Sequence, residues 1–134
     1  MSHLNAYRNR CNVLVVEPRP LLGALMMYVL RSIGLRGVGV YACGRCALHA
    51  LDESEECVSA ALVSTGLSDG GAFELASELL GRGIPVAFMA REHHAIPWEH
   101  REAPVIRLPY DVSDVDVALR PILGSPLRLK LPAF

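Results

Sequence analysis

The chain has 134 residues, of which 51% are hydrophobic and 20% charged, and its formal net charge is −1 at pH 7. This length favours one domain, and so apolar a composition excludes intrinsic disorder, because burial offsets the chain entropy lost on folding. A charge near zero gives no general attraction to nucleic acid or to an anionic membrane, and no apolar run reaches the ~18–20 residues that span a bilayer. With no secretory leader visible, the sequence predicts a cytoplasmic protein whose four cysteines are reduced thiols.

Short apolar runs alternate with helical patterns in the first half of the chain. The run Asn12–Val16 predicts a strand buried on both faces, and Pro18 and Pro20 then end the strand and begin a helix. Gly34 follows this helix, as is typical of a helix end. Its wide apolar stripe comprises Leu21, Leu22, Leu25, Met26, Val29, Leu30 and Ile33. After it, the sequence predicts a strand at Gly37–Tyr41, a short helix around 47–51 that ends in the acidic stretch 52–56, and a strand at Val58–Thr65.

The second half repeats this rhythm. Residues 92–101 predict at best a short or broken helix, because Pro97 interrupts the segment. The last helix has apolar residues between Val115 and Ile122, with Asp111 or Ser113 as candidate N-cap. The remaining predicted elements are a helix over 73–80 and strands at Ile84–Ala90 and Pro104–Leu108.

Strands regularly separated by helices predict a doubly wound α/β fold, with a five-stranded parallel sheet and helices on both of its faces. We expect one domain over residues 1–124, with a core at 12–123, and a tail at 125–134. The tail alternates leucines with Arg128 and Lys130, so we predict that it lies extended along the body or pairs with a partner. In such folds ligands bind beyond the carboxyl ends of the strands.

Four separate segments carry a resemblance to a known family: VLVVEPRPLL (13–22), LSDGGAFELASELLGRGIPVAFM (67–89), AIPWEHREAPVIRLPYD (95–111) and the last helix. Together they resemble the receiver domain of bacterial two-component response regulators, which has a flavodoxin-like (βα)5 fold. In that family two acidic residues after the first strand hold Mg²⁺ and an Asp after the third accepts phosphate. The fourth strand ends in Thr or Ser, and the fifth in Lys followed by Pro.

Most of these groups are absent from the matching positions. The resemblance places the two acidic positions at Glu17 and Pro18, and the phosphate acceptor at Ser64. The other matching positions are Ala90 for Thr or Ser, Leu108 and Pro109 for Lys-Pro, and Val105 for an aromatic residue that rotates on activation. Because Mg²⁺ and phosphoryl transfer need carboxylates and a cation there, the sequence predicts a degenerate receiver without metal or cofactor, which is not an enzyme.

A degenerate receiver would act by binding another protein, with a homodimer as one form of that binding. The resemblance implies a binding face around the fourth helix, fifth strand and fifth helix. On this chain that face would contain Trp98, Arg101, Val105, Arg107, Tyr110 and the outer side of residues 113–123. Trp, Tyr and Arg are enriched in protein interfaces.

An alternative function comes from Cys43-Gly44-Arg45-Cys46, which follows a predicted strand and begins a helix. This context is similar to that of a thioredoxin-like oxidoreductase, and Ile84–Pro85 resembles the proline that faces the motif in thioredoxins. A regulatory thiol pair and inert cysteines are the other interpretations. Cys43, Cys46 and His49 would supply three zinc ligands, but no fourth is adjacent. Three histidines near Trp98 are expected to be solvated: His93, His94 and His100.

Overall fold

The computed structural model describes residues 12–54, 57–67, 70–91 and 95–123. Strands and helices alternate along them, and each predicted strand is present with ends that differ by one or two residues at most. The elements are β1 (Asn12–Val16), α2 (Pro20–Ser32), β2 (Arg36–Tyr41), α3 (Gly44–Glu53), β3 (Ala60–Ser64), α4 (Ala72–Gly81), β4 (Val86–Ala90), the 3-10 turn η1 (Trp98–His100), β5 (Val105–Arg107) and α5 (Val112–Leu123).

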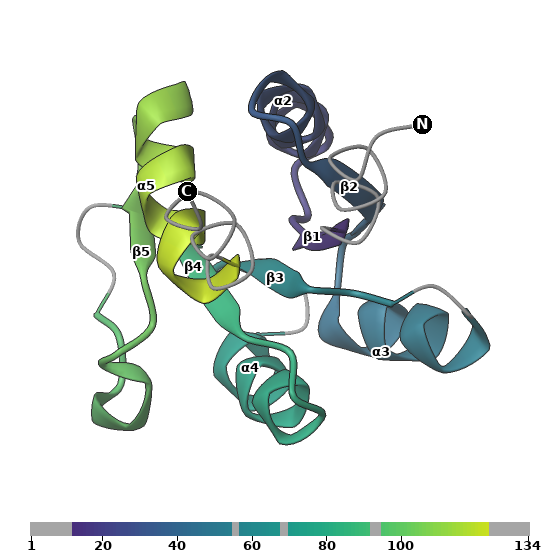
Figure 1. The fold of residues 1–134 in the computed structure, drawn as a ribbon. Helices are drawn as coiled ribbons and strands as arrows, with labels where there is room; N and C mark the ends of the chain where they lie inside the picture. The colour runs from purple at the N-terminus through teal and green to yellow at the C-terminus, as the bar shows by residue number, and fades with distance from the viewer. Residues whose placement is uncertain (1–11, 55–56, 68–69, 92–94, 124–134) are drawn as a thin grey trace, which may run out of the picture.

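The five strands form one parallel sheet in the order β2-β1-β3-β4-β5. Helices α2 and α5 cover one face and α3 and α4 cover the other (Figure 1). Every residue of the three central strands is buried, as expected for strands sandwiched between helices. The doubly wound α/β fold predicted from the sequence is therefore confirmed.

Sequence signals at the helix ends act as predicted. Gly34 adopts a positive φ of 85° after α2, and Leu35 donates its N–H back to the Leu30 carbonyl at 2.8 Å. Before α5, Asp111 accepts the N–H of Asp114 while Asp114 accepts the N–H of Asp111, each at 2.9 Å. This reciprocal capping box identifies Asp111, rather than Ser113, as the N-cap.

The connection between β4 and β5 contains no α-helix in its described part, residues 95–104. Only Trp98–His100 form a 3-10 turn there, so the fourth βα unit is incomplete. Its His100 is 5% exposed, which corrects the expectation that this histidine is solvated. The ring lies 6.0 Å from Phe73 and 5.6 Å from Phe88 between centroids, and Nε2 is 3.2 Å from the Ser77 hydroxyl. An aromatic ring thus covers a part of the sheet that lacks a helix. His93 and His94 lie outside the described residues.

Helix α2 is less one-sided than its sequence suggests. Met26, Val29 and Leu30 are buried against the sheet as predicted, but Leu21 is 85% and Leu25 46% exposed. Both belong to the predicted apolar stripe, so the buried face is narrower than that stripe, because a helix buries only one arc of its surface. The tail at 125–134 lies outside the described residues, among which no helix has the length and apolar character to cross a membrane.

Candidate functional site

The ends of the strands converge at one edge of the sheet. The N–H of Glu17 donates to the Tyr41 carbonyl at 2.8 Å, and the N–H of Leu108 donates to the Ala90 carbonyl at 3.0 Å. The register pairs Val16 with Val63, so Glu17 and Ser64 follow as neighbours on adjacent strands. The structure therefore places the positions matched by the family resemblance at the edge where a parallel α/β sheet binds its ligands.

Glu17 is the one carboxylate of that set, and its oxygens are engaged by its own turn. The side chain is buried, with 3% of the residue exposed. Oε2 accepts the backbone N–H and the Nε–H of Arg19, both at 2.9 Å, and Oε1 accepts an Nη2–H of Arg19 at 3.3 Å. The guanidinium thus binds the carboxylate in the bidentate way that makes such pairs strong. The pairing of Arg19 with Glu17 was not predicted from the sequence; its signal is a basic residue two positions after a buried acid.

The other positions present hydroxyl and hydrocarbon groups. Ser64 is 1% exposed, and its hydroxyl accepts the N–H of Gly66 at 3.2 Å. Ala90 is buried, Leu108 and Pro18 are half-buried, and Pro109 is exposed. The hydrogen bond described for this hydroxyl comes from a backbone N–H, which is not a base that could activate it.

Tyr110 lies close enough to this edge for the charges there to act on it. Burial raises the pKa of its phenol above the usual value, and the negative charge of Glu17 raises it further, while Arg19 lowers it. A half-buried phenol beside the ion pair completes a region that is apolar and internally neutralised. Tyr110 also packs against the core of the α2 and α5 face, so it is less of a surface residue than its predicted interface role requires.

The residues present do not fit Mg²⁺. This ion needs near-octahedral oxygen ligands, normally from one or two carboxylates together with phosphate oxygens. Here the one carboxylate is held by a cation, and the neighbouring positions supply no second one. Within the described segments, no three His, Cys, Asp or Glu side chains are grouped so that they could hold a metal ion.

The predicted interface residues divide into two groups. Trp98 is 75% exposed, and the guanidinium carbon of Arg101 lies 3.9 Å above its ring in a cation–π contact. Arg107 is exposed and donates to the Arg91 carbonyl at 2.9 Å. Val105, by contrast, is half-buried against the core on the α3 and α4 face. The structure therefore brings Trp98 and Arg101 together on the surface, but not Val105.

Exposed apolar side chains lie on α5, within the predicted binding face, and on α2, outside it. Val117 of α5 is 66% exposed, beside a groove of about 550 Å³ between β5 and α5. On α2, Tyr28 is 68% exposed and continues the line begun by Leu21 and Leu25 at helical spacing. Both places are candidate protein-binding surfaces, since exposed apolar residues that cluster usually mark an interaction site.

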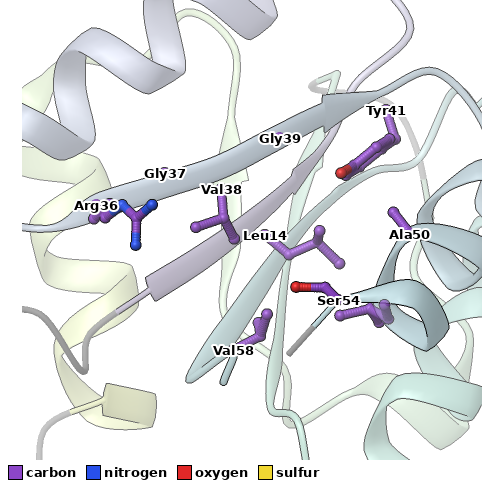
Figure 2. A pocket seen from close by; sticks show the side chains of 10 residues that line it. Leu14, Arg36, Gly37, Val38, Gly39, Tyr41, Ala50, Ser54 and Val58 are labelled. Carbon is purple, nitrogen blue, oxygen red and sulfur yellow. The ribbon is translucent and has the colours of Figure 1, made fainter. Parts of the chain in front are cut away.

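A small pocket of about 190 Å³ lies between β1, β2 and α3. Figure 2 shows Arg36 at one end, Tyr41 at the other, and Leu14 and Val38 between them. Gly39 has a positive φ of 71° there, where the β1–β2 register shifts. A Cβ on it would lie 2.4 Å from the Tyr41 ring. Its lining combines hydrocarbon with the polar side chains of Arg36, Tyr41 and Ser54. At about 190 Å³ the pocket is smaller than the ~300–1,000 Å³ typical of small-molecule sites.

The structure also brings Cys43 and Cys46 together, with their Sγ atoms 2.7 Å apart at the start of α3. The thioredoxin-like alternative is nevertheless not favoured. All strand pairs are parallel, whereas thioredoxins close their sheet with an antiparallel hairpin. Pro85 precedes β4, at the opposite edge of the sheet from the cysteines that follow β2, so it does not face the motif.

No family model matches this sequence, and no curated protein is a significant match. Solved structures do match. SdrG from Sphingomonas melonis Fr1 has a TM-score of 0.73 at 24% identity, over 84% of this chain and 96% of that one. The receiver domain of the response regulator PhyR from Erythrobacter litoralis has a TM-score of 0.69 at 22% identity, over 86% and 91%. The BeF3-activated conformation of SdrG from Pseudomonas melonis Fr1 has a TM-score of 0.71 at 25% identity, over 92% and 99%. The chain therefore has the receiver-domain fold.

Proposed function

We propose that this chain is a receiver-fold signalling protein that takes up no phosphate and acts by binding another protein. The fold supports the signalling role, because the solved structures that it matches include response-regulator receiver domains. The absence of a lysine, of a phosphate-accepting aspartate and of a second acid at the strand ends supports the loss of phosphoryl chemistry. On this proposal the chain is not an enzyme and needs no cofactor, and we expect it in the cytoplasm.

The ion pair of Glu17 with Arg19 is the observation that carries the proposal. A metal ion would have to displace a guanidinium that makes two side-chain hydrogen bonds to the buried carboxylate. Charge neutralisation of the transferred phosphoryl group normally comes from that metal and a cationic side chain. Arg19 is already paired with Glu17, and Leu108 carries no charge. The Glu17–Arg19 pair is charge-balanced without any ligand.

The test adds beryllofluoride and Mg²⁺ to the isotope-labelled chain and follows its amide chemical shifts by NMR. We expect no saturable shift at Glu17, Thr65 or Ala90. SdrG serves as the positive control under the same conditions, because a BeF3-activated conformation of it has been solved. Incubation with acetyl phosphate and Mg²⁺, followed by intact-mass measurement, should likewise give no phosphate adduct. Saturable shifts at this edge, or an adduct on this chain, would overturn the proposal.

For protein binding, we propose the surface formed by Trp98, Arg101 and the outer side of α5, including Val117. A Trp–Arg pair supplies residue types that are enriched at interface centres, and Val117 adds exposed apolar surface on α5. The simplest partner to test is a second copy of the chain. Light scattering of the full chain over a range of concentrations should give a mass above that of the monomer.

Matched variants assign the surface. The pair Trp98→Ala and Val117→Ser should lower that mass to the monomer value. The pair Leu21→Ser and Tyr28→Ser changes two comparably exposed side chains on α2 and should leave the mass unchanged. If only the α2 pair dissociates the assembly, the binding surface is assigned wrongly. A monomer at every concentration would exclude the homodimer.

The predicted division into a domain at 1–124 and a tail at 125–134 is tested in the same experiment. We propose that the tail covers apolar surface of the domain or of the second copy. Deletion of the tail should then reduce the number of chains per assembly or lower the solubility. A truncated chain that is unchanged in mass, solubility and stability would contradict a role for the tail.

A further inference from the structure

The turn between β2 and α3 places two thiols in contact. Cys43 is the N-cap of α3, with extended backbone angles of φ −142° and ψ 162°, and Cys46 is the third residue of the helix. Their Sγ atoms lie 2.7 Å apart. Since a disulfide has an S–S length of about 2.05 Å, closing the bond requires a short approach of two side chains and no movement of a helix or strand.

The surroundings of Cys43 favour an anionic sulfur. Its Sγ accepts the backbone N–H of Cys46 at 3.3 Å, one of the N–H groups that have no partner within a helix. The first turn of α3 contains Arg45 and no acidic residue. The N-terminus of a helix stabilises negative charge, and the thiolate is the form of cysteine that attacks disulfides.

Both sulfurs are accessible from solvent. Cys46 is exposed and Cys43 is half-buried, in contrast to Glu17 and Ser64 at the same edge of the sheet. A structural cysteine packed in a core would be inert, whereas two thiols in contact at the surface have a resolving partner ready. Contact, access and the helix N-terminus occur together at this turn.

We propose that Cys43 and Cys46 form a reversible intramolecular disulfide, with low-molecular-weight disulfides as the oxidant. The Cys43 thiolate attacks one sulfur of the small disulfide, whose S–S bond breaks and releases one thiolate. Cys46 then loses its proton and attacks Cys43 Sγ, and the mixed disulfide breaks to release the second thiolate. The two cysteines lose two electrons and two protons, and the small disulfide becomes two thiols.

The disulfide would change a defined surface. Gly44 and Arg45 lie between the two cysteines and line one end of a groove of about 490 Å³ between α3 and α4. The far wall of this groove carries Glu74 and Glu78. Closing the bond fixes the first turn of α3, and with it the position of Arg45 across from those carboxylates. The redox state of the pair thereby sets the shape and charge of the groove, independently of any phosphorylation.

The experiment equilibrates the full chain with reduced and oxidised glutathione and quenches it by alkylation. Tryptic mapping is diagnostic, because cleavage after Arg45 separates Cys43 from Cys46. The fragment that contains Cys46 also contains Cys57, so the mapping uses a Cys57→Ser variant. We expect a loss of two hydrogen masses, a disulfide that links peptides 37–45 and 46–82, and recovery of both thiols with excess reduced glutathione.

Single variants separate the steps. Cys46→Ser should abolish the link between the two peptides and leave a mixed disulfide of glutathione on Cys43. Cys57→Ser alone should leave the extent of Cys43–Cys46 disulfide formation unchanged. If the Cys57→Ser chain gives only mixed disulfides with glutathione, or no oxidation, the proposal is overturned. It is equally overturned if the two-hydrogen loss in the unmodified chain disappears with Cys57→Ser.

Discussion

The turn after β1 and the turn after β2 lie side by side, joined by the hydrogen bond from Glu17 N–H to the Tyr41 carbonyl, yet they differ in chemistry. The first buries a carboxylate and neutralises it with Arg19 from the same turn. The second exposes two sulfurs that contact each other. At the same edge of the sheet, burial and pairing with Arg19 leave the Glu17 carboxylate unreactive. Exposure and mutual contact make the two thiols available for reaction.

Placing a second carboxylate beside Glu17 should destabilise the turn after β1 most strongly. We call this turn, with its buried and paired carboxylate, the closed turn. Ser64→Asp puts a charge at a position that is 1% exposed. The neighbouring acid, Glu17, is already paired with Arg19, so that cation is not available to the new carboxylate. We expect the free energy of unfolding to fall by about 3 kcal/mol, because a buried charge without a partner is costly. Urea denaturation at pH 7 measures the loss. Ser64→Asn is the neutral control, and equal stability of the two variants would contradict a closed, neutral pocket.

Removing the cation tests the same turn from the other side. Arg19→Met leaves the Glu17 carboxylate buried with only backbone donors, and we expect a loss of about 2 kcal/mol in unfolding free energy. The double variant Glu17→Gln with Arg19→Met should recover part of this loss, since the uncompensated charge is gone. A double-mutant cycle from urea midpoints gives the coupling. Additive effects would show that the pair does not act as a unit.

The turn after β2, with its exposed cysteines, is the open turn. Substitutions there should change the free energy of unfolding less. Cys43→Ala removes the side chain that caps α3, and we expect a loss of about 1 kcal/mol, typical of a lost N-cap. Cys43→Ser keeps an acceptor at the N-cap and should be at least as stable as the unmodified chain under reducing conditions. Thermal unfolding with a reductant present compares the three proteins. A Cys43→Ala variant as stable as Cys43→Ser would mean that Sγ does not cap the helix.

The smallest expected effect concerns Tyr110, beside the closed turn, and appears only at alkaline pH. Its pKa is raised in the folded chain, so the neutral phenol stabilises the fold fully below the unfolded pKa of about 10. That stabilisation is lost as pH rises through the folded pKa. Tyr110→Phe cannot ionise, so we expect its stability to fall less than that of the unmodified chain above pH ~10. Parallel curves of urea midpoint against pH for the two proteins would refute this.

The sequence predicted the layout of the fold well because periodicity reports burial. The β-branched run Asn12–Val16 could be satisfied only by a strand covered on both faces, and the structure has that strand with the same bounds. The family resemblance assigned Glu17 and Ser64 to neighbouring strand ends, and the register agrees. Pattern is weak where the pairing of individual side chains matters. A basic residue two positions after an acid is compatible with a pair, but this spacing alone does not show that Arg19 turns back onto Glu17.

Solvent exposure was the other property that pattern could not supply. Leu21 and Leu25 fit the helical stripe of α2 but face outward, because the sheet covers only part of the helix surface. His100 fits a polar, solvated segment by its neighbours in sequence, yet it is buried by residues from α4 and β4. Contacts between segments that are distant in sequence decide whether such side chains are buried. Local composition does not reveal these contacts.

The burial of His100 has a consequence for where the molecule unfolds locally. Its Nδ1 has no hydrogen-bond partner among the described residues, so this corner gains ring packing but leaves one polar atom unsatisfied. In the described part of this connection, the imidazole, Ile96 and Ala103 cover the sheet where a packed helix would lie. Partial unfolding should therefore begin at this margin, and native-state hydrogen exchange of β5 should run ahead of the exchange of β1 and β3.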